Sequence, residues 1–310
     1  MEPGFCRLDR LGRLGLVLAA SLTLVAARPT AQAGTSNDFL RFLPAEPTAA
    51  GVMNLAQGKK NALFVKAAEQ MRKFAGSSGD PIAKLGVDIA KDLNTISCGA
   101  AAKKNDVQPF VCVLDGSFAK AAGLSPAAGS PGTAIHAGIT IVTIDNTEYA
   151  LVGKQLLVTN VGEMVAAINR GLGKAPNGLT SKKAAWLKSA LASARSGRHV
   201  WAALVPDAEQ SAQVREKTGA APSWMAVSLT FGDPIVVEMR AKTKSPAEAD
   251  TMVAALTTLA AEQQKTLTAM GLTGLAASLR IDRKDTLVRF NAAAPTKEIE
   301  TIVNLAKMLR

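Results

Sequence analysis

Histidine, cysteine and aromatic residues are scarce in this 310-residue sequence, and their scarcity excludes several kinds of chemistry. The two histidines, His136 and His199, have no sequence neighbours at the spacing of a catalytic triad or a metal site. Three cysteines fall short of the four ligands of a structural zinc site. Aromatic residues make up 4%, and the lysine pairs have none between them on which bases could stack. We therefore expect no metal, no cofactor and no nucleic-acid partner.

The sequence also has no long hydrophobic run: a membrane-spanning helix needs about 20 apolar residues, and no run reaches that length. The run nearest the N-terminus, Leu14–Ala27, follows three arginines and precedes the small-x-small triplet Ala31-Gln32-Ala33. This pattern predicts a secretory signal peptide at residues 1–33, cleaved between Ala33 and Gly34. An uncleaved anchor is the alternative. We expect export to the periplasm or the extracellular space, and a mature domain that does not span the membrane.

Positively charged residues outnumber negatively charged ones, with 36 Lys and Arg against 25 Asp and Glu. The formal net charge is +11, and loss of residues 1–33, with four Arg, one Glu and one Asp, leaves +9. Lys and Arg occur singly or in pairs such as Lys59-Lys60 and Lys182-Lys183, which is typical of a solubilising surface. The alternative is a basic surface that binds anionic lipid or polysaccharide of the cell envelope.

Two cysteines remain beyond the signal segment, and their spacing predicts a disulfide. Ile96–Ala102 and Phe110–Asp115 are expected to form a hairpin around Asn105, which lies seven residues from both Cys98 and Cys112. Directly opposed residues of an antiparallel pair are close enough to be bridged, and an oxidising compartment preserves the bond. Two buried free thiols are the alternative.

Turn residues and alternating apolar side chains predict antiparallel strands. Asp145-Asn146 separates Ile139–Ile144 from Thr147–Val152, with Gln155–Thr159 following, and Gly232-Asp233-Pro234 separates Ala226–Phe231 from Ile235–Ala241. In the last of these strands Glu238, Arg240 and Lys242 alternate with apolar residues. We therefore expect the face with the apolar residues to be covered and the face with the charged residues to be exposed to solvent. Residues 121–138, which include His136, are expected to form an irregular loop.

Helical patterns alternate with the strands. Ser245-Pro246-Ala247-Glu248 predicts a capped helix start and a helix to about Met270, followed by a hairpin of Ala276–Ile281 with Thr286–Asn291. Residues 34–196 and 197–310 both have the order strand, helix, two pairs of strands, helix, with a boundary at Arg195–Arg198. The expected class is α+β, with antiparallel sheet and helices packed on one face, in two topologically similar halves.

Several short phrases together resemble a group of uncharacterised exported bacterial proteins. The phrases are Phe42-Leu43-Pro44, Tyr149-Ala150-Leu151-Val152-Gly153-Lys154, Val158-Thr159-Asn160, His199-Val200-Trp201-Ala202 and Ser245-Pro246-Ala247-Glu248-Ala249. The resemblance implies a two-part α+β body and no catalytic residues, so it transfers no site.

One pair of motifs suggests an enzyme. Ser117-Phe118-Ala119-Lys120 fits the S-x-x-K motif and Lys217-Thr218-Gly219 the K-T-G motif of serine enzymes that react with penicillin. The S-D-N motif is missing between them, and Ala220-Ala221-Pro222 interrupts the strand that should follow K-T-G. We therefore expect Ser117 to cap a helix and Lys217 to end one.

These observations favour a non-enzymatic exported protein that binds or scaffolds an envelope or extracellular partner, with a groove between the two halves as the expected place. The alternatives are the penicillin-reactive enzyme, with Ser117, Lys120 and Lys217, and the basic binder of anionic lipid or polysaccharide.

Overall fold

The computed structural model describes residues 37–62, 64–65, 85–103, 107–118, 122–124, 132–193 and 198–301. The predicted signal peptide and its cleavage residues Ala31, Ala33 and Gly34 lie outside these ranges. Lys120, Arg195, most residues between 62 and 84, and residues 302–310 also lie outside them.

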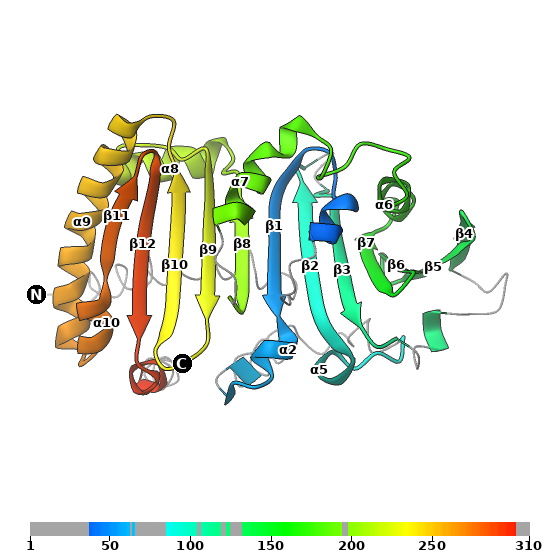
Figure 1. The fold of residues 1–310 in the computed structure, drawn as a ribbon, viewed down its shortest axis with the longest axis horizontal. Coiled ribbons are helices and arrows are strands. Elements are labelled where there is room, and N and C mark those ends of the chain that lie inside the picture. Colours follow the sequence, from blue (N-terminus) through cyan, green and yellow to red (C-terminus); the bar gives the residue numbers. More distant parts are fainter. Residues whose placement is uncertain are drawn as a thin grey trace, which may run out of the picture.

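The described strands of the twelve-stranded sheet form one open antiparallel layer (Figure 1), which confirms the α+β class. From one edge to the other the order is β11 (Arg280–Lys284), β12 (Leu287–Ala294), β10 (Ile235–Lys242), β9 (Trp224–Thr230), β8 (Val200–Leu204), β1 (Pro47–Asn54), β2 (Leu93–Ala101), β3 (Phe110–Gly116), β7 (Gln155–Asn160), β6 (Thr147–Val152), β5 (Ile139–Ile144) and β4 (Thr133–His136).

The two halves of the chain are continuous through the middle of this sheet. Strand β1 pairs with β8 from Ala49↔Leu204 to Met53↔Val200, so the boundary predicted near Arg198 separates two halves of one sheet. The order β1-β2-β3-β7-β6 in the first half corresponds to β8-β9-β10-β12-β11 in the second. The topological similarity expected from the sequence is therefore present in the strand order.

The turn residues of the sequence predicted most strands correctly, but the predictions for residues 121–138 and for the strand from Ala276 were wrong. Strands β5 and β6 have the predicted bounds, and Asp145 and Asn146 both adopt positive φ in the turn between them, as a tight two-residue hairpin requires. The loop predicted at 121–138 contains β4, with His136 at its end. The strand predicted from Ala276 begins only at Arg280, because the helix α10 (Thr273–Ser278) occupies its first residues.

The long helix α9 (Pro246–Ala269) begins where the sequence predicted. Ser245 accepts a hydrogen bond from the Glu248 backbone N–H, and the Glu248 carboxylate accepts one from the Lys244 N–H. The first bond satisfies a backbone donor that the first helical turn leaves unpaired, and the second holds the residue before the N-cap against the helix. Helix α8 (Ala208–Thr218) has a complete capping box between Asp207 and Gln210.

Side chains alternate between the two faces of the sheet, and helices cover different faces in the two halves. The face that carries Trp201 and Trp224, here called the tryptophan face, packs under η1 (Asn37–Arg41), α6 (Met164–Gly171) and α7 (Ala185–Ser193), mostly in the first half. The opposite face, here called the disulfide face, packs under α2 (Leu55–Gly58) in the first half and under α8 and α9 in the second. Strands β10, β12 and β11 therefore have a tryptophan face that neither α8 nor α9 covers.

The predicted disulfide is present on the disulfide face. Cys98 of β2 lies directly opposite Cys112 of β3, with 4.0 Å between the Cα atoms, and the two are bonded. Cys112 is buried in the core cluster with Ile96 and Tyr149. The bond therefore joins two central strands.

Candidate functional site

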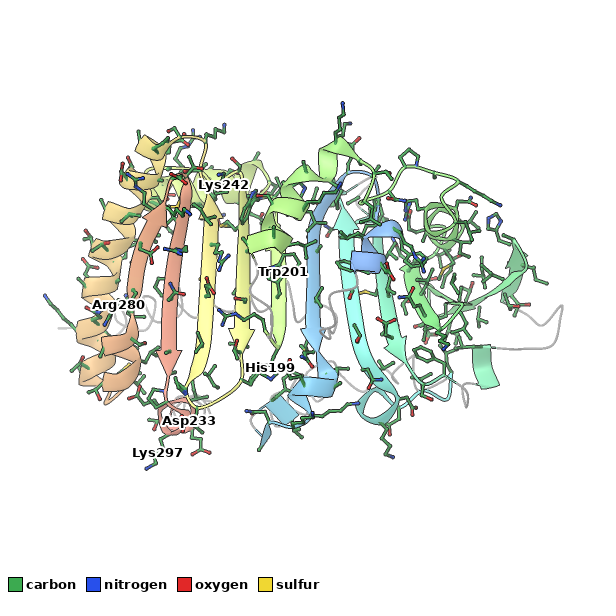
Figure 2. The ribbon with its side chains drawn as sticks, viewed as in Figure 1. His199, Trp201, Asp233, Lys242, Arg280 and Lys297 are labelled. Atoms are coloured by element: carbon green, nitrogen blue, oxygen red, sulfur yellow. A yellow bond between two sulfur atoms is a disulfide. The ribbon has the colours of Figure 1, made fainter. Side chains whose placement is uncertain are left out.

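The tryptophan face of β10, β12 and β11 carries a concentration of charged side chains, here called the polar face. It consists of Glu238, Arg240, Lys242, Arg289, Asn291, Arg280, Asp282 and Lys284, with Arg198 reaching over it from the start of β8. Figure 2 shows Trp201 on β8, Lys242 towards the end of β10 and Arg280 at the start of β11. Strand pairing therefore gathers residues from widely separated segments onto one surface.

Two rows of side chains cross this surface at right angles to the strands. One row runs Trp201, Ser228, Glu238, Asn291, Arg280, and the next runs Ala203, Ala226, Arg240, Arg289, Asp282. The residues nearest β8 in both rows are small or apolar and belong to the core beneath α7 or are buried beside it. The residues farther from β8 are charged or amide side chains.

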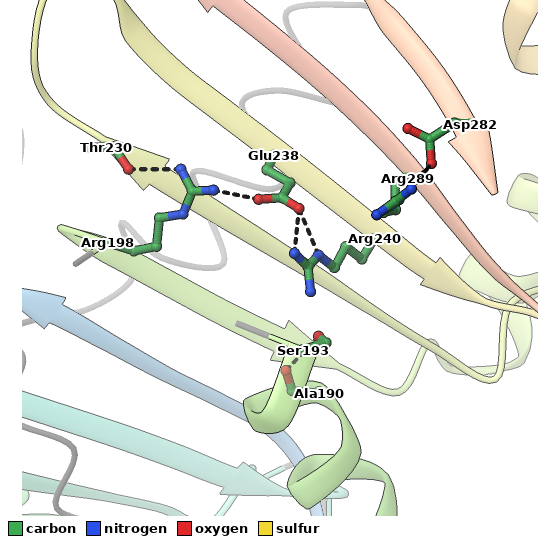
Figure 3. Close-up of polar contacts among 8 residues, drawn as sticks. All are labelled: Ala190, Ser193, Arg198, Thr230, Glu238, Arg240, Asp282 and Arg289. Carbon is green, nitrogen blue, oxygen red and sulfur yellow. Dashed lines mark hydrogen bonds and ion pairs between the residues drawn. The ribbon is translucent and has the colours of Figure 1, made fainter. Parts of the chain in front are cut away.

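Glu238 is the buried centre of the polar face, with only 3% of its side chain exposed (Figure 3). Arg198 donates to Glu238 Oε2 at 2.5 Å and to Thr230 Oγ1 at 2.9 Å. Arg240 donates from Nε to Glu238 Oε1 at 2.8 Å and also from Nη2. The prediction that Glu238 faces water was wrong, because the sequence pattern does not show that Arg198 extends across β9 to cover it.

Arg240 and Arg289 lie directly opposite each other across the β10–β12 pair. Arg289 donates from Nε to Asp282 Oδ1 at 2.5 Å, and its Nη2 lies 2.5 Å from the same oxygen. Like charges at directly opposed positions repel, and in this pair a different carboxylate compensates each guanidinium.

Two buried donors border the polar face without an acceptor in the described part of the chain. They are Arg198 Nε and the Trp201 indole N–H. Arg41 Nε, in the first half, is a third such donor. An unpaired buried N–H group lowers stability, so the border of the polar face has hydrogen-bonding capacity that the described residues do not use.

A second polar cluster lies on the tryptophan face of the first half. Gln155 donates to Asp115 Oδ1 at 3.0 Å and accepts a hydrogen bond from Arg41 at 3.2 Å. Burial raises the pKa of Asp115, the hydrogen bond from Gln155 opposes that rise, and the charge of Asp38 adds to it. These hydrogen bonds connect η1, through Arg41, to Gln155 of β7 and Asp115 of β3.

The residues of the proposed penicillin-reactive site are not brought together. Ser117 follows β3, is exposed, and donates its backbone N–H to the Asp92 carbonyl. Lys217 lies in the last turn of α8, which ends at Gly219 in a left-handed conformation. Strands β3 and β9 are four strand spacings apart, about 19 Å at the usual spacing. Lys217 ends a helix as predicted, whereas Ser117 caps no described helix.

The surface has a shallow depression of about 460 Å³ between Gly173 and Ser181. It lies in the loop between α6 and α7, within the first half, and so is distinct from the groove expected between the halves. Asn177 dominates its floor, but the side chain of Asn177 accepts from the Leu179 and Thr180 N–H groups and donates to the Arg170 carbonyl. These bonds shape the loop itself.

His199 is buried at the start of β8 among aromatic rings. Its Nδ1 accepts the Phe231 backbone N–H at 3.1 Å, and the rings of Phe231 and Phe64 lie 5.8 and 6.4 Å away between centroids. Burial lowers the pKa of His199 below its ordinary value of 6.5. His136, by contrast, lies on edge strand β4, and its Nε2 lies 3.0 Å from Asn169 Oδ1.

The lowered pKa of His199 predicts that acid destabilises the fold. Between pH 6.5 and the lower folded-state pKa, the unfolded chain binds more protons than the folded chain, so the free energy of unfolding falls as pH falls through this window. The substitution His199→Asn, which keeps an acceptor for the Phe231 N–H, should flatten that dependence in urea unfolding between pH 7.5 and 5. Equal slopes for wild type and His199→Asn would contradict the prediction.

Within the described ranges, no three His, Cys, Asp or Glu side chains are grouped so that they could hold a metal ion. None of the described helices combines the length and apolar character that crossing a membrane requires.

Comparison with known proteins identifies a shared fold and no family. No family model matches this sequence, and no curated protein matches it. The crystal structure of TP0453 in crystal form I is similar, with a TM-score of 0.50 and 11% identity over 87% of this chain and 98% of that chain. At this identity the similarity concerns the fold alone, and it agrees with the α+β class.

The polar face was only partly visible in the sequence. Alternation in β10 placed Glu238, Arg240 and Lys242 on one side, as found. In the sequence, Arg198 lies at the boundary between the two halves, and Arg289 lies within an expected strand. Neither has a local sequence signal, because each joins the site through strand pairing.

Proposed function

We propose that this chain is an exported, non-enzymatic binding protein whose polar face binds an anionic polysaccharide. One observation carries the proposal: the six cationic side chains of this face are Arg198, Arg240, Lys242, Arg280, Lys284 and Arg289, against the two carboxylates of Glu238 and Asp282. A rigid surface with this imbalance attracts polyanions and presents many N–H donors to them.

Export is supported by the predicted signal peptide and by the disulfide, which is a bond characteristic of oxidising compartments. The resemblance to uncharacterised exported bacterial proteins points to the same location and stays a prediction.

Binding without catalysis is supported by the chemistry of the polar face. Its one buried carboxylate, Glu238, is held between two guanidinium groups. Both of its carboxylate oxygens accept hydrogen bonds from these guanidinium groups, so they are engaged within the protein and do not face a substrate. Apart from Asp282, which accepts from Arg289, the other groups of the face can donate hydrogen bonds to oxygen atoms of a ligand.

Polysaccharide is favoured over lipid or protein because the described residues of this surface include no exposed large apolar side chain; Leu287, opposite Lys242, is partly buried against the core. Insertion into a bilayer and tight protein binding both use exposed large apolar side chains. Among the described residues of the second half, Leu259 is the large apolar side chain with high exposure, and it lies on α9, a helix that packs on the disulfide face. A flat surface of charged and amide groups suits a chain of hydroxyl and carboxylate groups.

The test is chromatography on immobilised polygalacturonate with a salt gradient. Lys242→Gln/Arg280→Gln/Lys284→Gln should elute at clearly lower salt than wild type, because three contacts are lost and the remaining attraction is screened sooner. The control, Lys154→Gln/Lys217→Gln/Lys265→Gln, removes three exposed charges elsewhere and should elute with wild type.

Three results would overturn the proposal. Wild type could pass through the column unretained, or both triple variants could shift equally, which would reflect net charge alone. Binding to phosphatidylglycerol vesicles that persists at high salt, without retention on the polysaccharide, would replace polysaccharide by lipid.

A further inference from the structure

We propose that Arg240 and Arg289 form a clamp for one oxoanion of the bound polysaccharide, either a uronic acid carboxylate or a sulfate ester. This inference rests on the proposed function and names the group on the ligand that the polar face recognises. It starts from the position of the two arginines, which are directly opposed on neighbouring strands and project to the same side of the sheet.

Both guanidinium groups are oriented in the same manner by a carboxylate. Arg240 uses Nε and Nη2 to bind Glu238, and Arg289 uses Nε and Nη2 to bind Asp282. In both residues Nη1 makes no hydrogen bond to a described residue. A guanidinium is a planar fork with five N–H donors, so each arginine keeps one end of its fork available while the carboxylate holds the other.

The charged groups of this cluster carry one positive charge more than they carry negative charges. Arg198 and Arg240 share Glu238, and Arg289 is paired with Asp282. Three guanidinium groups therefore face two carboxylates, and one bound oxoanion would balance the cluster.

Exposure and a neighbouring amide indicate where the oxoanion enters. The Arg289 side chain is 32% exposed, whereas that of Arg240 is 11% exposed, so a ligand meets Arg289 first. Asn291 lies two residues along β12 on the same face, and its side-chain amide makes no hydrogen bond to a described residue. It can donate to a second oxygen of the same group. Because the carboxylates already order the arginines, binding costs little side-chain entropy.

The variant Arg289→Lys tests the clamp, because lysine keeps the positive charge and loses the fork. The matched control is Arg283→Lys. Arg283 is 33% exposed and binds Asp250 through Nε and Nη2 at 2.6 and 2.8 Å, but it projects to the disulfide face. Urea unfolding of both variants confirms that they fold.

Binding is measured by calorimetry with tetragalacturonate, its methyl ester and a dextran sulfate oligomer. Wild type should bind an acidic oligomer and not the neutral ester. Arg289→Lys should weaken that binding about tenfold, as expected for loss of a charge-assisted, two-pronged hydrogen bond, while its elution from polygalacturonate shifts little. Arg283→Lys should match wild type. The tighter-binding acidic oligomer identifies the oxoanion as carboxylate or sulfate ester.

The possible failures are distinguishable. If Arg289→Lys binds the oligomers as well as wild type while the Lys242/Arg280/Lys284 variant still elutes early, the clamp is wrong and the polar face still binds polysaccharide. If wild type binds neither oligomer nor column, the proposed function itself is wrong.

Discussion

Replacing Glu238 by alanine should lower the free energy of unfolding by about 3–5 kcal/mol, the usual cost of leaving a buried charge without its partner. Arg198 and Arg240, with side chains 13% and 11% exposed, would both lose their carboxylate. Neither guanidinium can neutralise itself, because an arginine side chain does not lose its proton in a protein. Urea unfolding followed by circular dichroism measures the change.

Asp282→Ala is the control for this prediction. Asp282 also accepts from an arginine, Arg289, but its side chain is 46% exposed, and exposed pairs contribute about 0–1 kcal/mol. If the two substitutions cost the same, Glu238 does not hold the polar face together, and the orientation of Arg240 needs another explanation.

The double substitution Cys98→Ala/Cys112→Ala should lower the free energy of unfolding by about 3 kcal/mol. The bond closes a loop with a sequence separation of 14, and in the chain-entropy model a loop of this size restricts the unfolded chain by about that amount. The bond lies between two central strands, so its loss should reduce the stability of the sheet as a whole. Urea unfolding again measures the change.

Reduction provides the control for the disulfide. Dithiothreitol should move the unfolding midpoint of wild type close to that of the double variant and leave the double variant unchanged, since the double variant has no Cys98–Cys112 bond to reduce. A wild-type midpoint that is insensitive to full reduction would contradict a stabilising role for the bond.

Elements with strong local signals were predicted well from the sequence. Asp145-Asn146 is a favourable pair for a tight turn, and the hairpin around it has the predicted bounds. Ser245-Pro246 begins α9 as expected, because capping depends on a few adjacent residues. The symmetric spacing of Cys98 and Cys112 around Asn105 was enough to place them opposite each other.

Elements without such signals were mispredicted. Strand β4 is four residues long and contains Thr, Ala, Ile and His, too short for alternation to be recognised. The region 273–281 is rich in Ala and Leu, which suit a helix or a buried strand, and its packing against α9 and β12 decides where α10 ends.

The sequence alone determined the α+β class, the repeated order of elements and the disulfide, because each depends on residues close together in the chain or on alternation within one strand. Only the tertiary structure decided that the two halves join through β1 and β8, that Glu238 is buried, and that Arg198, Arg240 and Arg289 share one surface. These features depend on which strands are neighbours and in what register. Pairing between distant segments determines both the neighbouring strands and their register, and the residue pattern of one strand does not indicate which strand it pairs with.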